Sequence, residues 1–547
     1  MAETRNLVLE IGTEEIPSRF CAMALEQLKA NAIKALDDAR LDYQLVDVFG
    51  TARRLVLNVR SLSLMQRDVE RVQKGPSKKV AFDAEGKPTM AAQKFAQSQG
   101  IPVEALEIQA DEKGGEYLYA RRLEQGQSVA KILPPLLADL VLSIQWPKPM
   151  RWGDRSIRYA RPIHWLLAML GDRVVPFDVD GITTGNTTVG HRVLGSKSPV
   201  VVADADDYFA KVNNQGVMVD QQLRKTAIWQ QITLEARRVH GYVAQDEELL
   251  EEITWLVEHP TAFTGSFDPA FLDVPAEVLV TTMKENQRYF PVYESAESHQ
   301  LLPHFIAVRN GGGDFIDTVR AGNEKVLAAR LADARFFWDE DRKHPLASYN
   351  QKLKQAVFQE KLGTQYERVE RLVTLAAKAA GLLNLSPSEK EQAVDAARLC
   401  KADLATRMVF EFPEVQGYMG QQYLLREGGD PAVARAIYEH YLPRGAGDEL
   451  PRTRPGIVAA LTDKLDTLAG YFSIGMIPTG SQDPFALRRA AQGVVQTIVE
   501  NNLTVDIGEL CSEALLGYQP ADGVDALKAL NDMLDFFKAR AKVQMEQ

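Results

Sequence analysis

A helix-length run at residues 322–343 has the most distinctive pattern of apolar and charged positions in the chain. Its apolar residues recur at helical spacing: Val326, Leu327, Leu331, Ala334 and Phe337. This periodicity predicts an amphipathic helix. Charged residues fill most of the other positions, more densely than burial of one helix face requires, so we expect the helix to have a further role.

The first part of the chain alternates between strand and helix patterns. A strand is predicted at 6–11, a helix from the turn at 12–17 to about Leu36, and strands at 43–49 and 54–59. Residues 70–109 are polar and read as loop. Further elements are expected along the region: strands at 116–123, 173–179, 187–193, 261–265 and 303–309, and a charged helical stretch at about 220–258.

Beyond about residue 320 the pattern becomes almost entirely helical. Ser386 to Glu389 form a capping box with proline at the first helical position, opening a helix that we expect to reach Phe410. Pro455 starts another helix, with Ile457, Leu461, Leu465 and Leu468 along one face, and a last helix covers about 525–547. The predicted fold is α+β and multidomain: a mixed α/β region at 1–320 with two or more subdomains, a helical domain at 321–500, and a short region at 501–547.

Composition narrows the class of protein. The 547 residues are 45% hydrophobic and 25% charged, typical of a globular chain of three or four domains. No apolar run suits a membrane span, no signal-peptide pattern opens the chain, and three scattered cysteines exclude a disulfide framework. We therefore expect a cytoplasmic protein without a membrane partner. The net charge of −11 argues against indiscriminate coating of nucleic acid.

Common catalytic motifs are absent from the sequence. It contains no P-loop, no HExxH zinc motif and no GxSxG nucleophile elbow. The eight histidines are scattered, with no pair at helical spacing, so a clustered zinc site is not expected. We assign no catalytic residue and no metal site to this chain.

Three aspartates in the helical half form a first candidate site: Asp403, Asp463 and Asp466. Helical metal-dependent phosphohydrolases of the HD superfamily use histidines and aspartates in this order to hold a metal that activates water. Here Ala402 precedes Asp403 where a histidine is needed. We therefore interpret the HD-like positions as vestigial, with the carboxylates in salt bridges, and keep a metal-dependent HD phosphohydrolase as an alternative.

Basic stretches form a second candidate site. Lysines and arginines near 148–161 are interleaved with Trp146, Trp152 and Tyr159, which suits a phosphate backbone with bases to stack. The candidate RNA contacts are Arg53, Arg54, Lys74, Lys78, Lys79, Lys148, Arg151, Arg155, Arg158, Arg161, Arg488 and Arg489. Each basic patch, taken alone, is also compatible with an ordinary solvent-exposed surface. There its lysines and arginines would pair with acidic residues, which outnumber the basic ones in this chain.

Several segments in a fixed order resemble one known family. They include EIGTEEIP at 10–17, DKLDTLAG at 463–470 and DPFALRRA at 483–490. The remaining matches lie at 51–55, 74–76, 82–88, 150–153, 161–162, 190–192, 274–277, 283–284, 289–293, 322–325, 331–333 and 408–412. With these segments, the chain resembles the β subunit of the bacterial heterotetrameric glycyl-tRNA synthetase along almost its whole length.

The resemblance implies a division of labour between two chains. The partner α subunit of that family holds the class II active site, which uses ATP and Mg²⁺ to make glycyl-adenylate. The β subunit contributes contacts to tRNA(Gly) within an α2β2 assembly, through an N-terminal region with body-tail and B3/B4-like parts, an HD-like domain and an anticodon-binding domain. In agreement, this chain lacks class I and class II signature motifs. No cofactor is expected in this chain itself.

One departure from the family concerns the C-terminus. Family members continue beyond the point where this sequence stops, and the part after about Asn501 resembles only the opening of the anticodon-binding domain. We therefore expect weak anticodon contacts and a main RNA contact at the acceptor end. A chain that serves only as a structural platform for the α subunit remains a further alternative.

Overall fold

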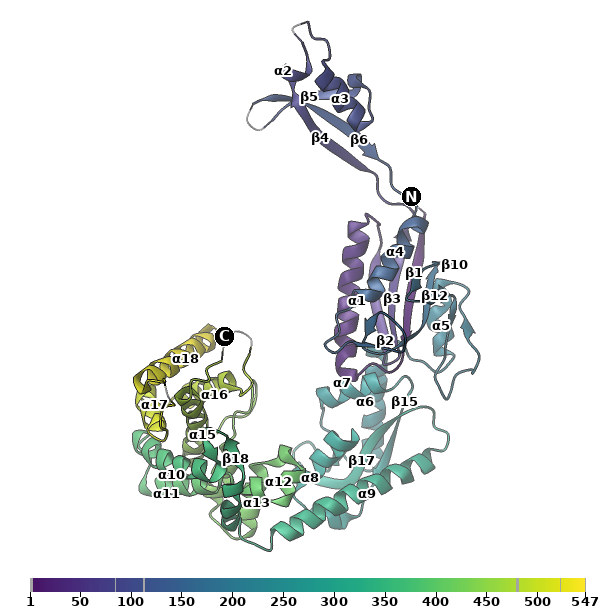
Figure 1. Cartoon of the computed structure of the whole chain (residues 1–547). Helices are drawn as coiled ribbons and strands as arrows, with labels where there is room; N and C mark the ends of the chain where they lie inside the picture. The colour runs from purple at the N-terminus through teal and green to yellow at the C-terminus, as the bar shows by residue number, and fades with distance from the viewer. Residues whose placement is uncertain (1–2, 84, 112–113, 479–481, 522, 547) are drawn as a thin grey trace. The chain divides into compact units, whose positions relative to one another are not determined.

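The computed structural model describes residues 3–83, 85–111, 114–478, 482–521 and 523–546. The chain divides into two compact units (Figure 1). The first comprises Met1–Thr264, Val292–Ser298 and Ile306–Arg320, and the second Gly265–Pro291, His299–Phe305 and Ala321–Gln547. The first unit mixes sheets with helices and the second is mainly helical, which confirms the predicted α+β multidomain class.

A seven-stranded sheet forms the centre of the first unit, in the order β11-β12-β9-β1-β3-β2, with β10 paired to β9. Its strands are β1 (Thr4–Thr13), β2 (Leu45–Thr51), β3 (Arg54–Ser63), β9 (Ile163–Leu170), β10 (Arg173–Val174), β11 (Asp178–Val179) and β12 (Ile182–Gly185). The central strands β9, β1, β3 and β2 run antiparallel to one another, whereas β12 pairs parallel with β9. The expected strands at 6–11, 43–49 and 54–59 are confirmed.

Strand β1 is buried on both faces of this sheet. Leu7, Leu9 and Ile11 pack in the core that also holds α1 (Ser18–Asp38) and α4 (Val129–Leu142). Val8 points to the opposite core, around Tyr208 of α5 (Tyr208–Asn213). Because side chains alternate along a strand, Glu10 lies on the same face as Val8 and is fully buried.

The close packing of the neighbouring strand β9 requires a glycine at residue 12 of β1. Gly12 lies opposite Trp165 of β9, and a Cβ atom at residue 12 would lie 1.9 Å from the indole ring. Any other residue would displace the ring, so the glycine fixes the close approach of the two strands.

Residues 69–124 form a small sheet of their own, in the order β4-β6-β5. The segment contains β4 (Val69–Ser77), α2 (Lys78–Ala81), α3 (Met90–Gln99), β5 (Leu106–Ala110) and β6 (Glu116–Glu124). The expected strand at 116–123 is confirmed, but the expected loop at 70–109 is wrong. Its core is small, built around Ala81, Ala92 and Leu118, so the segment lacks the long apolar pattern that marks most strands.

Shorter elements complete the region up to residue 310. They are β7 (Met150–Arg151), β8 (Arg158–Tyr159), β13 (Thr187–Thr188), β14 (Val200–Val201), α6 (Gln221–Arg238), α7 (Glu247–Leu256), β15 (Pro260–Ser266), α8 (Ala276–Thr281), β16 (Phe290–Tyr293) and β17 (Leu301–Asn310). The charged stretch at 220–258 is two helices, separated where His240 has a φ of 53°. The strands at 173–179 and 187–193 are reduced to two-residue pairs, whereas β15 and β17 confirm the expected strands.

The later helices are α9 (Ile316–Asp341), α10 (Gln365–Leu382), α11 (Pro387–Leu399), α12 (Arg407–Glu411), α13 (Tyr418–Arg426), α14 (Pro431–Glu439), α15 (Arg454–Ser473), α16 (Leu487–Glu500), α17 (Ile507–Leu515) and α18 (Ala526–Glu546), with a short strand pair β18 (Val357–Gln359) and β19 (Gly363–Thr364). The capping box of α11 is present. This helix ends at Leu399 rather than Phe410, and Thr406 caps a separate α12.

Helix α15 forms the centre of the helical unit, with α10, α11, α14, α16, α17 and α18 packed around it. The expected apolar face of α15 is confirmed as buried. The rest of the helix is buried as well, including Thr462, Asp463 and Lys464. The segment after residue 500 belongs to the same packing, because the ring of Phe536 in α18 lies 5.4 Å from that of Phe472 in α15. None of the helices in the described part of the chain is long and apolar enough to cross a membrane.

Candidate nucleic-acid interface

A short hairpin carries the most concentrated positive charge of the predicted RNA contacts. Strands β7 and β8 pair so that Arg151 lies directly opposite Arg158, and Lys148 precedes the hairpin. All three side chains are exposed. Like charges directly opposite one another repel. In the described part of the chain, Lys148 and Arg151 have no ion-pair partner, so the hairpin presents free positive charge to solvent.

Two other arginines of this segment hold its shape instead. Arg155 donates to the backbone carbonyl of Asp180, whose carboxylate accepts the backbone N–H of Ser156 at 2.6 Å. Arg161 donates to the backbone carbonyl of Glu15 at 2.9 Å. Both guanidinium groups are only partly exposed, so their main role in the structure is to anchor the segment.

The aromatic rings of this segment are largely unavailable for stacking on bases. Trp146 and Tyr159 are buried and meet edge to face, with ring centroids 4.9 Å apart. Trp152 is half-buried, and its indole N–H donates to the backbone carbonyl of Tyr159 at 3.1 Å. The expectation that Trp146 and Tyr159 stack on bases is therefore wrong, because both rings belong to the core.

The lysines near residue 75 are exposed but mostly paired. Lys74 lies 2.9 Å from the carboxylate of Asp111, and Lys78 lies 2.9 Å from that of Glu116. Lys79 is exposed beside them. A phosphate would have to compete with these acids, although surface ion pairs of this kind contribute little free energy. Direct RNA contact by these lysines stays a prediction.

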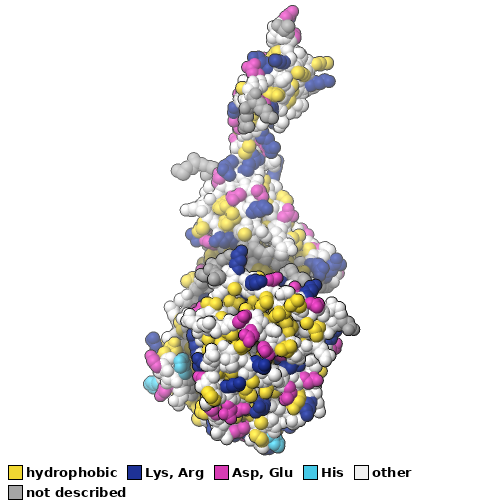
Figure 2. All heavy atoms as spheres, turned by 90° about the vertical axis from the view of Figure 1, so that its left-hand side faces the viewer, with side chains coloured by type: hydrophobic (Ala, Val, Ile, Leu, Met, Phe, Trp, Pro, Cys, Tyr) yellow, Lys and Arg dark blue, Asp and Glu magenta, His cyan; other side chains and the backbone are white. Residues whose placement is uncertain are grey.

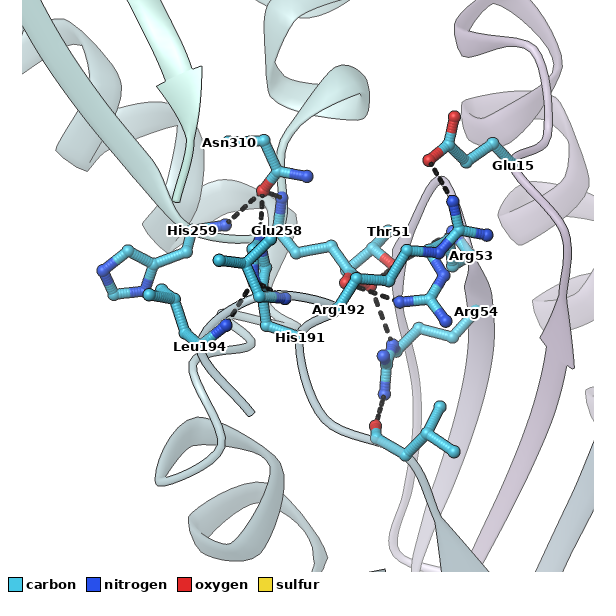
Figure 3. Close-up of polar contacts among 12 residues, drawn as sticks. Glu15, Thr51, Arg53, Arg54, His191, Arg192, Leu194, Glu258, His259 and Asn310 are labelled. Carbon is cyan, nitrogen blue, oxygen red and sulfur yellow. Dashed lines mark hydrogen bonds and ion pairs between the residues drawn. The ribbon is translucent and has the colours of Figure 1, made fainter. Parts of the chain in front are cut away.

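Arg53 and Arg54 lie inside the first unit, around Glu258 (Figure 3). The fully buried Arg54 pairs with Glu258 and Glu10 at 3.1 Å each, and Arg53 pairs with Glu258 at 3.4 Å. Thr51 donates its hydroxyl to the same carboxylate at 2.8 Å. The expected RNA contact is therefore wrong for Arg54, whose guanidinium has no exposed surface, and Arg53 shares its structural role.

Glu258 is ionised in this cluster. Burial alone would raise its pKa, but the charges of Arg54 and Arg53 and the Thr51 hydroxyl lower it overall. Asn310 holds the backbone of the same segment, because its side-chain oxygen accepts the N–H of Glu258 at 2.9 Å and that of His259 at 3.2 Å. Sequence reasoning missed Glu258, which lies 204 residues from Arg54, and Asn310, which lies 52 residues from Glu258.

Arg488 and Arg489 occupy the first turn of α16. The backbone N–H of Arg488 donates to the carboxylate of Asp483 at 2.9 Å, and the side chain of Arg489 is exposed. Together with Arg540 of α18, both arginines line a pocket of about 280 Å³.

On the face of the molecule in Figure 2, lysines and arginines are interspersed with acids, so basic groups act there as local sites rather than as one continuous surface.

Two of the predicted HD-like positions, Asp463 and Asp466, belong to a buried network of ion pairs. Asp463 accepts from Arg368 at 3.0 Å and from Lys401 at 2.9 Å. Asp466 lies 2.9 Å from Arg371. The expected interhelical salt bridges are confirmed for these two aspartates. Sequence reasoning missed the arginines, although Arg368 and Arg371 repeat on α10 the three-residue spacing of the aspartates on α15.

A lysine ammonium occupies the position between the acidic and histidine groups of this network. The Nζ atom of Lys401 lies 2.9 Å from Asp463 and 3.0 Å from the Nε2 atom of His440. Asp403 lies nearby in the 3₁₀ turn Ala402–Ala405 and accepts the backbone N–H of Gly417 at 2.6 Å. A divalent ion at this place would meet an ammonium and a guanidinium, so the geometry opposes the phosphohydrolase alternative.

In the part of the chain that the structure describes, no group of three or more His, Cys, Asp or Glu side chains is arranged to hold a metal ion. Two of the three carboxylates of the predicted HD-like layout, Asp463 and Asp466, are instead neutralised by cationic side chains. Burial would raise the pKa of Asp463, but Arg368 and Lys401 hold it well below its ordinary range.

Acidification from pH 7 to about pH 6 is expected to destabilise the helical unit through His440. Burial, and then the charge of Lys401, lowers the pKa of this buried imidazole well below its ordinary value of about 6.5. As the pH falls to about 6, the unfolded chain therefore binds a proton that the folded chain does not accept. The free energy of unfolding decreases as the pH falls. Asp403 has the opposite effect on stability below about pH 6. Burial raises its pKa to about 6, so the folded chain binds this proton at a higher pH than the unfolded chain does.

Urea unfolding at several pH values, followed by hydrogen exchange in α14 and α15, measures this effect. The His440→Gln variant should lose the slope between about pH 6 and pH 7 and become more stable as the pH falls from about 6 to 5. An equal slope in the variant and in the wild-type chain would show that His440 does not cause it.

Comparison with known proteins assigns the family. The model of the glycyl-tRNA synthetase beta subunit family matches residues 7–547. The glycine–tRNA ligase beta subunit of Moorella thermoacetica is 47% identical over 548 residues, covering 99% of this chain and 78% of the relative. Those of Desulforamulus reducens and Clostridioides difficile are each 46% identical, over 98% of this chain and 77% of each relative. The chain belongs to the glycyl-tRNA synthetase beta subunit family and is part of an aminoacyl-tRNA synthetase that includes an alpha subunit.

Proposed function

We propose that this chain binds tRNA(Gly) and positions its acceptor arm, so that the 3′ end reaches the active site of the alpha subunit. The match to the beta subunit family over residues 7–547 carries this proposal. The chain supplies no reacting group of its own. Its contribution to the rate is orientation, since holding two reactants in the right geometry lowers the entropic part of the barrier.

The proposed assembly is an α2β2 heterotetramer in the cytoplasm. ATP and Mg²⁺ are used at the alpha subunit, where glycyl-adenylate forms before glycine is transferred to the RNA. The beta subunit is then needed for the second step, because that step alone requires the acceptor end of the tRNA.

The hairpin β7–β8 supports the acceptor-arm contact within the first unit. Lys148, Arg151 and Arg158 are exposed on a segment whose base is fixed by Arg155 and Arg161. A rigid segment with free cations binds a phosphate backbone at small conformational cost and releases counterions as it does so. Arg155 and Arg161 anchor the segment, whereas Lys148 and Arg151 are exposed without an ion-pair partner among the described residues. We therefore favour Lys148 and Arg151 as direct contacts.

The double substitution Lys148→Gln with Arg151→Gln is expected to weaken tRNA(Gly) binding about tenfold. Each phosphate contact contributes about 0.9 to the slope of log affinity against log salt on duplex nucleic acid, so the slope should fall by up to about 2. Filter binding over a salt series measures both quantities. Glycyl-adenylate formation by the complex with the alpha subunit should stay unchanged, whereas glycylation of tRNA should slow.

The matched control is Lys87→Gln with Arg238→Gln. These exposed cations already pair with Glu85 and Glu235, so the control removes the same charge without removing a proposed contact. Unchanged affinity and salt dependence in the hairpin variant would exclude the hairpin as an RNA contact. Normal glycylation by the alpha subunit alone would exclude the proposed function as a whole.

A further inference from the structure

A pocket between α16, α18 and the loop at 443–446 has an unusual set of lining residues. Its volume is about 280 Å³, and the described residues that line it include Arg488, Arg489 and Arg540 but no acid. Gln492 and Gln496 add two side-chain amides. Three guanidinium groups lining one pocket are unexpected in a chain whose net charge is −11.

Two of these arginines lack the partners that other arginines of the helical unit have. Arg489 is exposed without an ion-pair partner among the described residues. Arg540 is half-buried, its Nε atom has no hydrogen-bond partner, and its guanidinium lies 5.0 Å from the ring of Phe536. By contrast, the following arginines of this unit all pair with acids: Arg368, Arg371, Arg398, Arg435, Arg444 and Arg454.

Two acids of the neighbouring loops are already engaged. Asp483 accepts the backbone N–H groups of Leu487 and Arg488 at 2.9 Å each and so caps α16. Asp448 is bound by Arg444 at 2.9 Å. The buried Nε atom of Arg540 has lost its hydration without a compensating hydrogen bond, so an acceptor bound in the pocket would stabilise it.

A buried cation below the pocket adds to its positive potential. Lys464 packs under Gly493, where a Cβ atom would lie 2.9 Å from the lysine Cε atom. Its Nζ atom donates to the backbone carbonyl of Leu442 at 2.7 Å, next to the loop that lines the pocket. In a site of low dielectric constant, this charge favours an anion more strongly than a surface lysine does.

The size and donor geometry identify the class of anion. A pocket of about 280 Å³ has room for a phosphate group, and its arginine lining favours an anion over an uncharged ligand. Guanidinium forks match phosphate oxygens in a bidentate manner. Arg489 is exposed at the rim of the pocket, where the nucleic-acid strand on either side of a bound phosphate would continue into solvent.

We propose that this pocket binds a single phosphodiester group of the tRNA backbone, as a second RNA contact separate from the β7–β8 hairpin. This inference rests on the proposed function and adds a site to it. Arg489 and Arg540 hold the phosphate oxygens, Gln492 and Gln496 donate from the side, and the bases make no contact there. The site strengthens binding without reading sequence.

The test uses the full chain with the alpha subunit and tRNA(Gly) over a salt series. Arg489→Gln and Arg540→Gln should each weaken tRNA binding about fivefold and lower the salt slope by about 1. Arg540→Lys should keep the salt slope while losing affinity, because the charge remains and the fork is lost. The matched controls Arg398→Gln and Lys538→Gln remove cations paired with Asp395 and Asp535 and should change neither quantity.

A second arm distinguishes RNA from a free anion. Calorimetric titration with inorganic phosphate should show only weak, millimolar binding, and millimolar phosphate should compete with tRNA in the wild-type chain but less in Arg540→Gln. Tight phosphate binding with unaltered tRNA affinity in the variants would assign the pocket to a free anion and overturn the inference. If the wild-type complex binds no tRNA, the proposed function fails; if it binds and the folded variants bind equally well, only the pocket assignment fails.

Discussion

Replacing Glu258 with glutamine is expected to lower the free energy of unfolding of the first unit by about 3–5 kcal/mol. One carboxylate neutralises both Arg53 and Arg54, at 3.4 and 3.1 Å, and also accepts the Thr51 hydroxyl. Glutamine removes the charge, so Arg54 keeps only Glu10 as an acidic partner and Arg53 keeps none among the described residues. Urea unfolding with hydrogen exchange in β1 and β3 measures the loss.

Glu247→Gln provides the control for this substitution. Glu247 pairs with Lys225 at 2.9 Å, but its side chain is 59% exposed, so its removal should have little effect on stability. A similar small effect for Glu258→Gln would mean that the arginines find water or other acceptors. Retained RNA affinity in a folded Glu258 variant would agree with the interior position of Arg54.

Asp463→Asn is expected to destabilise the helical unit by a similar amount, about 3–5 kcal/mol. The substitution leaves Lys401, whose side chain is 2% exposed, without an anionic partner at hydrogen-bonding distance. Arg368 would retain Asp466 at 3.4 Å. Lys401 would keep the neutral imidazole of His440 as a hydrogen-bond partner, but that ring does not neutralise its charge. Thermal unfolding and exchange in α10 and α15 report the loss.

Asp395→Asn is the matched change on the surface of the same unit. Asp395 pairs with Arg398 at 2.9 Å, and both side chains are about half exposed. Its loss should be small. Adding Lys401→Met to Asp463→Asn should recover part of the stability, because the double variant contains no orphaned ammonium; a double variant weaker than either single one would contradict this account.

The sequence predicts those parts of the fold in which local pattern and burial agree. Strand β1 and helix α1 have strong apolar periodicity, and the capping box at Ser386 marks the start of α11. The small sheet at 69–124 was missed because its core contains mainly alanines. The break between α6 and α7 depends on the backbone conformation of His240, which no periodicity reveals.

The candidate site was less predictable, because charge in a sequence does not reveal its partner. Arg53-Arg54 and Arg488-Arg489 are similar doublets, yet the first is enclosed around Glu258 and the second lines an open pocket. The difference comes from an acid about 200 residues away, which only the fold brings to the first pair. Resemblance to a family supplied the function, and the structure separates the anchoring cations from the available ones.

The Lys401 ammonium has a consequence for how the helical unit depends on its surroundings. A metal ion exchanges with the solvent, so proteins built around one become sensitive to chelators and to the supply of that metal. A side chain cannot diffuse away. The positive charge between Asp463 and His440 is supplied with the polypeptide itself, so this centre is complete as soon as the chain folds.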